Sequence, residues 1–148
     1  MVGIDSEELL GVAALVARLE SETLASLEPS LTSRQYRLLR VIDQGQETAT
    51  MIYENATISL AAISQSVDLL VQRGLLRRAR APEDGRRVIL SLTDPGRAVL
   101  AEAAARMDTL AAHLIGAPAE QQVTELRQAL RLLRERVVTL LRSREPSR

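Results

Sequence analysis

Apolar residues recur every three or four positions from about residue 5 to residue 27, which predicts an amphipathic first helix. Asp5 is suited to cap its N-terminus, and Pro29 follows its end. A second helix is predicted to start at Thr32, because Gln35 stands where a capping box places its amide. Gly45 is expected to stop this helix.

The middle of the chain predicts two further helices and a hairpin. A short third helix is expected from about Thr48 to Ala56, and a fourth from its cap Ser59 to about Gln72. Alternating apolar residues from Val88 to Leu92 then predict a strand that returns from a turn. Two helices joined by a short turn and followed by a hairpin form a winged helix-turn-helix.

Two long helices complete the pattern. The fifth opens at Thr93-Asp94-Pro95, with proline in the first turn where its missing donor costs nothing. The sixth, from about residue 123 to 141, has a wide apolar arc that we expect to pack against the first helix and a second copy of the chain. The expected fold is mainly α (α+β), a single domain over 1–148. Residues 31–93 would form a winged helix-turn-helix lobe, and the long terminal helices, 1–30 and 94–148, a dimerisation region.

The composition narrows the possible functions. The chain has 148 residues and 46% hydrophobic residues, enough for one domain with its own core. There is no apolar run of about 18 residues and no signal-peptide pattern, so we expect a cytoplasmic protein without a membrane partner. Without cysteine there can be no disulfide or thiolate metal site, and the single His113 cannot form a metal site alone. We therefore expect no metal and no cofactor.

The charge is balanced overall but separated along the chain. The 19 basic residues are all arginine, and they equal the acidic residues in number. Residues 1–30 carry six carboxylates against one arginine, whereas residues 57–92 carry six arginines against three carboxylates. A local basic surface of this kind favours duplex DNA as a partner.

The predicted hairpin carries this positive charge. Arginine side chains at the tip of a projecting hairpin suit the narrow minor groove, where the negative potential is concentrated. Asp84 precedes Arg86 by two residues, so its carboxylate could hold that guanidinium in one orientation before DNA arrives. Asp84 could instead simply favour a turn before Gly85.

Short motifs in a fixed order extend this interpretation. They are Leu31-Thr32 with Gln35 and Leu39, Leu70 with Gly74-Leu75, Arg78, Asp84-Gly85-Arg86, and Leu92-Thr93 with Gly96. With them the chain resembles the MarR family of bacterial winged-helix regulators over almost its full length. The resemblance implies a homodimer held by the first and last helices. It also implies recognition helices in two successive major grooves and wings in the flanking minor grooves.

The resemblance and the base-edge chemistry together give a set of candidate DNA contacts. The predicted fourth helix, which the resemblance makes the recognition helix, departs from the family because it lacks an outward arginine. Tyr53 in the predicted third helix stands where the family has a small residue. Gln65 could pair with an adenine edge, while apolar residues could touch thymine methyl groups. The candidates are Ser59, Leu60, Ala61, Ala62, Gln65, Ser66, Arg78, Arg80, Asp84, Arg86 and Arg87. Arg78 and Arg80 are expected at phosphates.

Other functions find less support. The family often binds small aromatic acids or other lipophiles between the dimer-forming helices and the lobe. The corresponding candidates here are Arg18, Tyr36, Met107 and His113. A catalytic triad needs a histidine beside a nucleophile, and His113 lies among alanine and leucine, so we expect no catalytic residues and no enzyme. A repressor responsive to a ligand is the expected function. A winged-helix dimer that acts through protein contacts is the alternative.

Overall fold

The chain folds into six helices and one two-stranded antiparallel sheet within the part that the structure, a computed structural model, describes: residues 3, 5–55 and 59–144. The helices are α1 (Ser6–Ala25), α2 (Ser33–Asp43), α3 (Ala49–Asn55), α4 (Leu60–Gln72), α5 (Asp94–Ile115) and α6 (Glu120–Ser143). The strands are β1 (Leu76–Arg80) and β2 (Val88–Leu92). The predicted mainly helical winged fold is therefore confirmed.

The predicted helix starts are confirmed by their capping bonds. Asp5 accepts a hydrogen bond from the Glu7 N–H at 3.1 Å at the start of α1. At α2 the capping box is complete, because the Gln35 N–H donates to Thr32 Oγ1 and the Thr32 N–H donates to Gln35 Oε1. Ser59 caps α4 by accepting from the Ala62 N–H at 3.3 Å. These bonds satisfy backbone donors that the first helical turn leaves free.

The lobe formed by α2, α3, α4 and the hairpin, residues 31–93, is called the winged lobe below. Its helices and strands enclose one apolar core to which α1 and α5 also contribute. The largest fully buried side chains are those of Leu24, Leu27, Leu39, Ile63, Val67, Leu70, Leu75 and Leu76. Buried residues of α4 recur at helical spacing, so one face of this helix is fixed against the core and the other is exposed.

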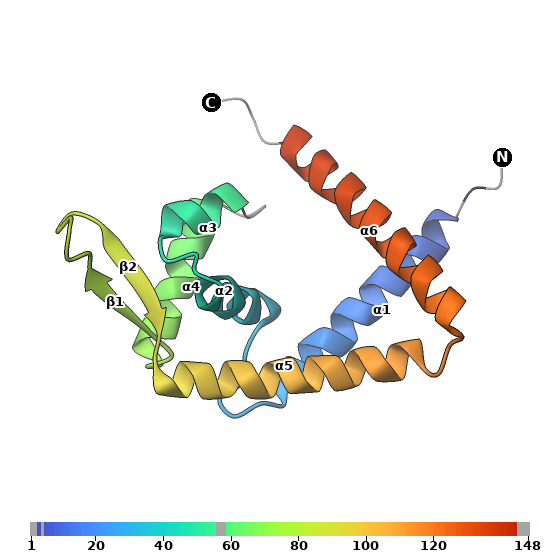
Figure 1. Cartoon of the computed structure of the whole chain (residues 1–148), viewed down its shortest axis with the longest axis horizontal. Coiled ribbons are helices and arrows are strands. Elements are labelled where there is room, and N and C mark those ends of the chain that lie inside the picture. The colour runs from blue at the N-terminus through green and yellow to red at the C-terminus, as the bar shows by residue number, and fades with distance from the viewer. Residues whose placement is uncertain (1–2, 4, 56–58, 145–148) are drawn as a thin grey trace.

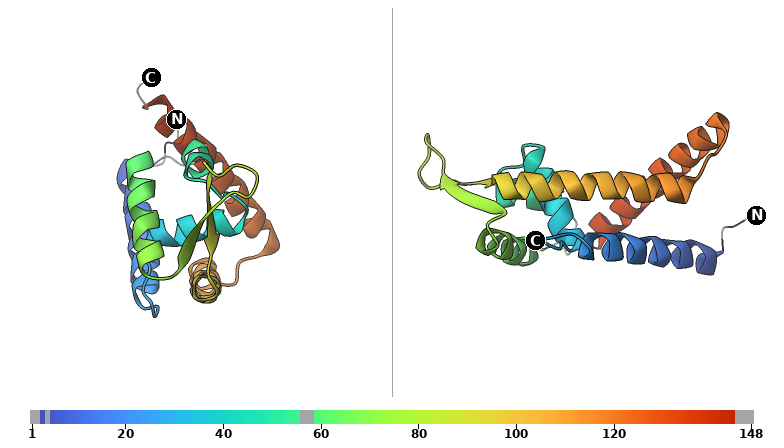
Figure 2. Two further views of the ribbon diagram at one scale, coloured as in Figure 1. Left: turned by 90° about the vertical axis from the view of Figure 1, so that its left-hand side faces the viewer. Right: turned by 90° about the horizontal axis from the view of Figure 1, so that it is seen from below.

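The hairpin pairs Leu76 with Leu92 at its root and Arg80 with Val88 near its tip. The Leu90 N–H also donates to the Glu47 carbonyl at 2.7 Å, which ties β2 to the segment before α3. Leu90 and Leu92 face the core as predicted, but Val88 is 47% exposed because it lies near the tip, before β2 reaches the body of the lobe. Figure 2 shows the hairpin extending beyond the helices at one end of the molecule.

The helix α5 connects the root of the hairpin to the far end of the molecule (Figure 1). Thr93 caps α5 by accepting from the Gly96 N–H, while its own hydroxyl donates to the Gly74 carbonyl at 2.6 Å. Gly74 has φ +70 directly after α4, a conformation that favours glycine and ends the helix. The end of β2, the end of α4 and the start of α5 therefore meet at one point.

The helix α6 turns back from the end of α5 and has no buried residue along its described length, Glu120–Ser143. The sequence predicted that it packs against α1 and against a second copy of the chain, and within the single chain none of the side chains of α6 is buried. Large apolar side chains are exposed on both helices. They are Leu9, Leu10, Val12, Leu15, Val16 and Leu19 on α1, and Leu126, Leu130, Leu132, Leu133, Val137, Leu140 and Leu141 on α6.

Candidate nucleic-acid interface

The exposed side of α4 forms the first part of the candidate site. It is called the outer face below and consists of Leu60, Ala61, Ser64, Gln65, Asp68, Leu69 and Gln72. Leu60 and Leu69 are 45% and 44% exposed, an unusual exposure for leucine on a helix that also fills the core. Among these seven side chains Asp68 is the one that carries a charge. The outer face is thus apolar and amide-bearing rather than basic.

Two of the predicted contacts on this helix turn out differently from the prediction. Ser66 is 6% exposed, and its hydroxyl donates to the Ala62 carbonyl at 2.9 Å, so it faces the core and not the outer face. Ala62 is half-buried. Ser66 lies three residues after Ile63 and four before Leu70, both buried, so the helical repeat places all three on one side. The same repeat places Ser64 on the outer face, a residue that the sequence analysis did not select.

The remaining residues around α4 lie partly outside the described structure. The predicted turn at Thr57 and Ile58 falls outside the described residues. Tyr53 lies in α3, but its side chain is likewise outside them, so the proposed effect of its bulk on the packing of α3 stays a prediction. Ser59 and Gln65 are both exposed, as predicted.

The tip of the hairpin forms the second part of the site. Asp84 Oδ1 accepts a hydrogen bond from the backbone N–H of Arg86 at 3.0 Å, and the Asp84 carbonyl accepts from the Arg87 N–H. The carboxylate therefore shapes the turn, and the prediction that it holds the Arg86 guanidinium is wrong for this structure. Within the described residues the side chains of Arg86 and Arg87 are exposed and make no hydrogen bond or ion pair.

The arginines within residues 73–80 are held by protein groups. Arg78 Nη2 donates to Asp68 Oδ1 at 2.6 Å, which joins β1 to α4. Arg80 Nη1 donates to the Gly85 carbonyl at 3.3 Å, so it supports the loop at the tip. Arg73 donates to Gln35 Oε1 at 3.2 Å and to the Ser30 carbonyl, and so fastens the end of α4 to the start of α2. Fewer of the arginines counted between residues 57 and 92 are therefore available to contact another molecule than the sequence suggests.

A hollow of about 330 Å³ lies between α4 and the hairpin. Its lining residues are Ala49, Ser64, Val67, Arg78, Val88 and Leu90. A second hollow beside the loop between α1 and α2 is lined by residues that include Glu28 and Arg73. Neither hollow is lined by the four residues that the sequence suggested for an effector.

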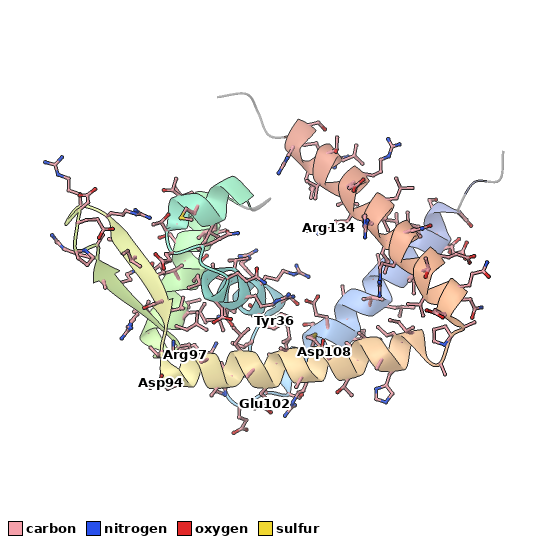
Figure 3. The ribbon with its side chains drawn as sticks, in the orientation of Figure 1. Tyr36, Asp94, Arg97, Glu102, Asp108 and Arg134 are labelled. Carbon is pink, nitrogen blue, oxygen red and sulfur yellow. The ribbon has the colours of Figure 1, made fainter. Side chains whose placement is uncertain are left out.

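Those four residues have different environments. Tyr36, labelled in Figure 3, is buried. The guanidinium of Arg40 lies 5.7 Å from its ring centroid. Arg18 is exposed and paired with Glu22 at 2.7 Å, and the hydrogen bond to this carboxylate, with its charge, raises the pKa of Arg18 above its ordinary value. Met107 is half-buried against the core, and His113 is exposed near the end of α5.

The described residues contain no group of three or more histidine, cysteine, aspartate or glutamate side chains that could hold a metal ion. No helix within the described ranges is both long and apolar enough to cross a membrane.

The fold and the exposed features of the lobe define a winged helix-turn-helix protein. A model of the MarR family matches residues 30–87, which covers most of the winged lobe. A comparison with curated proteins gives no match.

Solved structures extend the likeness to nearly the whole chain. FabT from Streptococcus pneumoniae, solved in complex with DNA, has a TM-score of 0.80 at 20% identity, covering 90% of this chain and 95% of that chain. Wild-type MarR from E. coli in its apo form has a TM-score of 0.71 at 23% identity, covering 89% and 98%. PcaV from Streptomyces coelicolor, in complex with its natural ligand, has a TM-score of 0.70 at 25% identity, covering 91% and 98%.

The resemblance drawn from the sequence is thus confirmed. The model of the MarR family matches the winged lobe by sequence, and the described chain has the fold seen in FabT and MarR.

Proposed function

We propose that the protein is a cytoplasmic, homodimeric transcription regulator that binds duplex DNA, with α4 in the major groove and the hairpin in the adjacent minor groove. The observation that carries the proposal is the position of Arg86 and Arg87. Both lie at the tip of a hairpin that projects past the helices, and both are exposed without an acidic partner among the described residues. Guanidinium groups in this position can enter a narrow minor groove or contact its phosphates.

The outer face of α4 supplies the proposed base contacts. Gln65 can make a bidentate pair with an adenine edge, and Leu60 and Ala61 can contact thymine methyl groups. Ser59 and Ser64 can donate to phosphates or base edges near the start of the helix. Ser66 is not part of the proposal, because it is buried. The face favours A·T-rich sites and relies in part on DNA shape.

Exposed leucine and valine side chains on α1 and α6 support the homodimer. These residues form long apolar strips on helices that the single chain does not cover. Such extended apolar surface is characteristic of association sites. In this proposal residues 1–30 and 94–148 hold two copies together, and the two winged lobes then read half-sites about one helical turn apart.

Control by a small molecule completes the proposal. The similar structure of PcaV is a complex with its natural ligand. In this chain a lipophilic or aromatic acid would bind between the dimer-forming helices and the lobe, near Tyr36, Arg18, Met107 or His113. Because both lobes must match the spacing of the half-sites, a ligand that favours another spacing by about 1–3 kcal/mol would release the DNA. The protein would then act as a repressor.

The test is a footprint of the purified full-length chain on the DNA upstream of its own reading frame, followed by titrations at several salt concentrations. We expect a protected pseudo-palindrome and an affinity that falls steeply as salt rises, because phosphate contacts displace counterions. Absence of protection on this DNA and of salt-dependent binding to any duplex would contradict the proposal.

One observation favours the alternative, a dimer that acts through protein contacts. The outer face of α4 exposes two leucines and carries no basic residue. A partner protein bound there would be held through apolar contacts, so its affinity would depend little on salt. The same salt titration therefore separates the two functions.

A further inference from the structure

The ion pair between Asp68 and Arg78 joins α4 to the hairpin. Asp68 lies on the outer face of α4, and Arg78 lies in β1, where its Cα pairs with that of Leu90. Arg78 Nη2 donates to Asp68 Oδ1 at 2.6 Å, a distance typical of a strong charge-assisted hydrogen bond. The Arg78 and Asp68 side chains are 42% and 59% exposed, so the pair lies at the surface.

The position of Asp68 matters for a helix that approaches DNA. It is the single charged residue in α4, whose residues Leu60–Gln72 are all described. An uncompensated carboxylate there would repel the phosphates on either side of the major groove. Arg78 cancels this charge at short distance, and the outer face becomes electrically neutral.

The same contact removes Arg78 from the set of free arginines. A guanidinium already bound to a carboxylate has less to gain from a phosphate, and both partners of the pair sit on rigid elements that fix their geometry. Arg86 and Arg87 have no such partner among the described residues. The arginines of the winged lobe therefore differ in their availability, although the sequence shows them as one basic cluster.

We propose that Asp68 holds Arg78 as its counterion, so that the pair locks the hairpin to α4 and neutralises the helix that faces DNA. Arg78 is then a positioning residue and not a phosphate ligand. The inference rests on the proposed DNA binding, and it replaces the expectation that Arg78 meets a phosphate.

The experiment compares the wild-type chain with Arg78→Gln, Asp68→Asn and the double variant. The probes are a duplex selected by the wild-type protein from a randomised pool and a duplex of scrambled sequence. Arg78→Gln should weaken binding to the selected duplex at least tenfold, because it leaves the Asp68 carboxylate without a counterion. The double variant should return to within threefold of the wild type. If the double variant stays as weak as Arg78→Gln, Arg78 contacts phosphate itself and the proposal is wrong.

The Asp68→Asn variant gives an independent readout. Its freed Arg78 should bind a phosphate, so affinity for the scrambled duplex should rise at least threefold. The slope of log affinity against log salt should steepen by about 0.9, the value for one added phosphate contact. An unchanged slope and unchanged affinity for scrambled DNA would contradict the proposal.

The ion pair between Arg97 and Asp94 is a matched control, since it has the same length of 2.6 Å and lies at the start of α5 (Figure 3). Arg97→Gln, Asp94→Asn and their double variant change the net charge in the same way. Each should bind both duplexes within twofold of the wild type. An equal response at the two pairs would show a general effect of charge and would overturn the inference.

Failure of the proposed function is distinguishable from failure of this inference. If the wild-type chain binds no duplex, the proposed function fails. The proposal that the Asp68–Arg78 pair holds the hairpin to α4 is then tested by amide hydrogen exchange on the protein without DNA. Asp68→Asn and Arg78→Gln should each speed exchange in β1 and β2 at least threefold, whereas Asp94→Asn should not; Arg97→Gln is left out of this comparison because Arg97 also donates to the Leu92 carbonyl of β2 at 3.1 Å. Equal exchange in all proteins would overturn the lock.

Discussion

A β-carbon on Gly96 would lie 2.0 Å from the carbonyl oxygen of Leu75. This glycine is in the first turn of α5, where the helix start passes directly over the backbone that leads into β1. The Leu75 carbonyl also accepts from the Thr93 N–H at 3.2 Å, so it cannot move away without breaking that bond. The close approach fixes the root of the hairpin against the helix that leads to the other end of the molecule.

Gly96→Ala should therefore destabilise the fold by roughly 1–3 kcal/mol, the usual cost of forcing an extra group into a packed site. Thermal or urea denaturation of the full chain measures this. Gly85→Ala is the control, because nothing lies within 4 Å of a β-carbon at that position. Equal stability of the two variants would show that the approach is not restrictive.

Arg86→Ala should weaken binding to a selected duplex by about tenfold, or ~1.4 kcal/mol, while leaving the oligomeric state unchanged. The reason is that its side chain is exposed at the hairpin tip and free of protein partners among the described residues. A gel-shift titration measures the loss. Arg142→Ala, which removes an exposed arginine from the end of α6, should bind as the wild type does. Unchanged binding by Arg86→Ala would remove the hairpin from the interface.

Asp84→Asn should retain DNA binding within about twofold, whereas Asp84→Ala should lose more. The Asp84 side chain accepts from the Arg86 backbone N–H, and an asparagine oxygen can make the same turn-forming bond. Gel-shift titration of both variants distinguishes this from a role of the carboxylate charge. A large and equal loss in both would show that the charge itself orients a guanidinium.

Gln65→Ala should relax base preference more than it lowers affinity, because the exposed amide on α4 is proposed to read an adenine edge. Selection from a randomised pool by the variant measures the preference. Ser66→Ala is its neighbour control and should leave the selected sequence unchanged, since that hydroxyl is bonded within the helix. Equal losses by Gln65→Ala on selected and scrambled duplexes would refute the reading role.

Leu130→Glu should convert a dimer to monomers, because it places a charge on an apolar strip where Leu130 is 56% exposed in the single chain. Sedimentation velocity measures the oligomeric state, and gel shifts should show at least a tenfold loss of DNA affinity. Gln128→Glu adds a charge to the same helix at a polar position and serves as the control. A Leu130→Glu protein that remains a dimer would place the contact elsewhere.

The sequence by itself determined the helix starts, the hairpin and the helical faces. Thr32 with Gln35, Ser59 and Thr93 cap their helices through bonds to residues three positions away, and such bonds depend on local backbone geometry alone. The apolar repeat of α4 likewise fixes which side is buried, so the exposure of Ser64 and the burial of Ser66 were available from the sequence.

Only the tertiary structure decided how the arginines are used. Arg78 meets Asp68 ten residues away, and Arg73 meets Gln35 thirty-eight residues away, because folding brings β1 beside α4 and the end of α4 beside α2. A sequence lists these charges but carries no local signal of which carboxylate or carbonyl each guanidinium will reach. The sequence also predicted the apolar arc of α6. That no other part of the single chain buries this arc is known only once the positions of the other helices are known. Long-range contacts of this kind follow from the packing of the whole core, since the distance between two side chains is then set by every element between them.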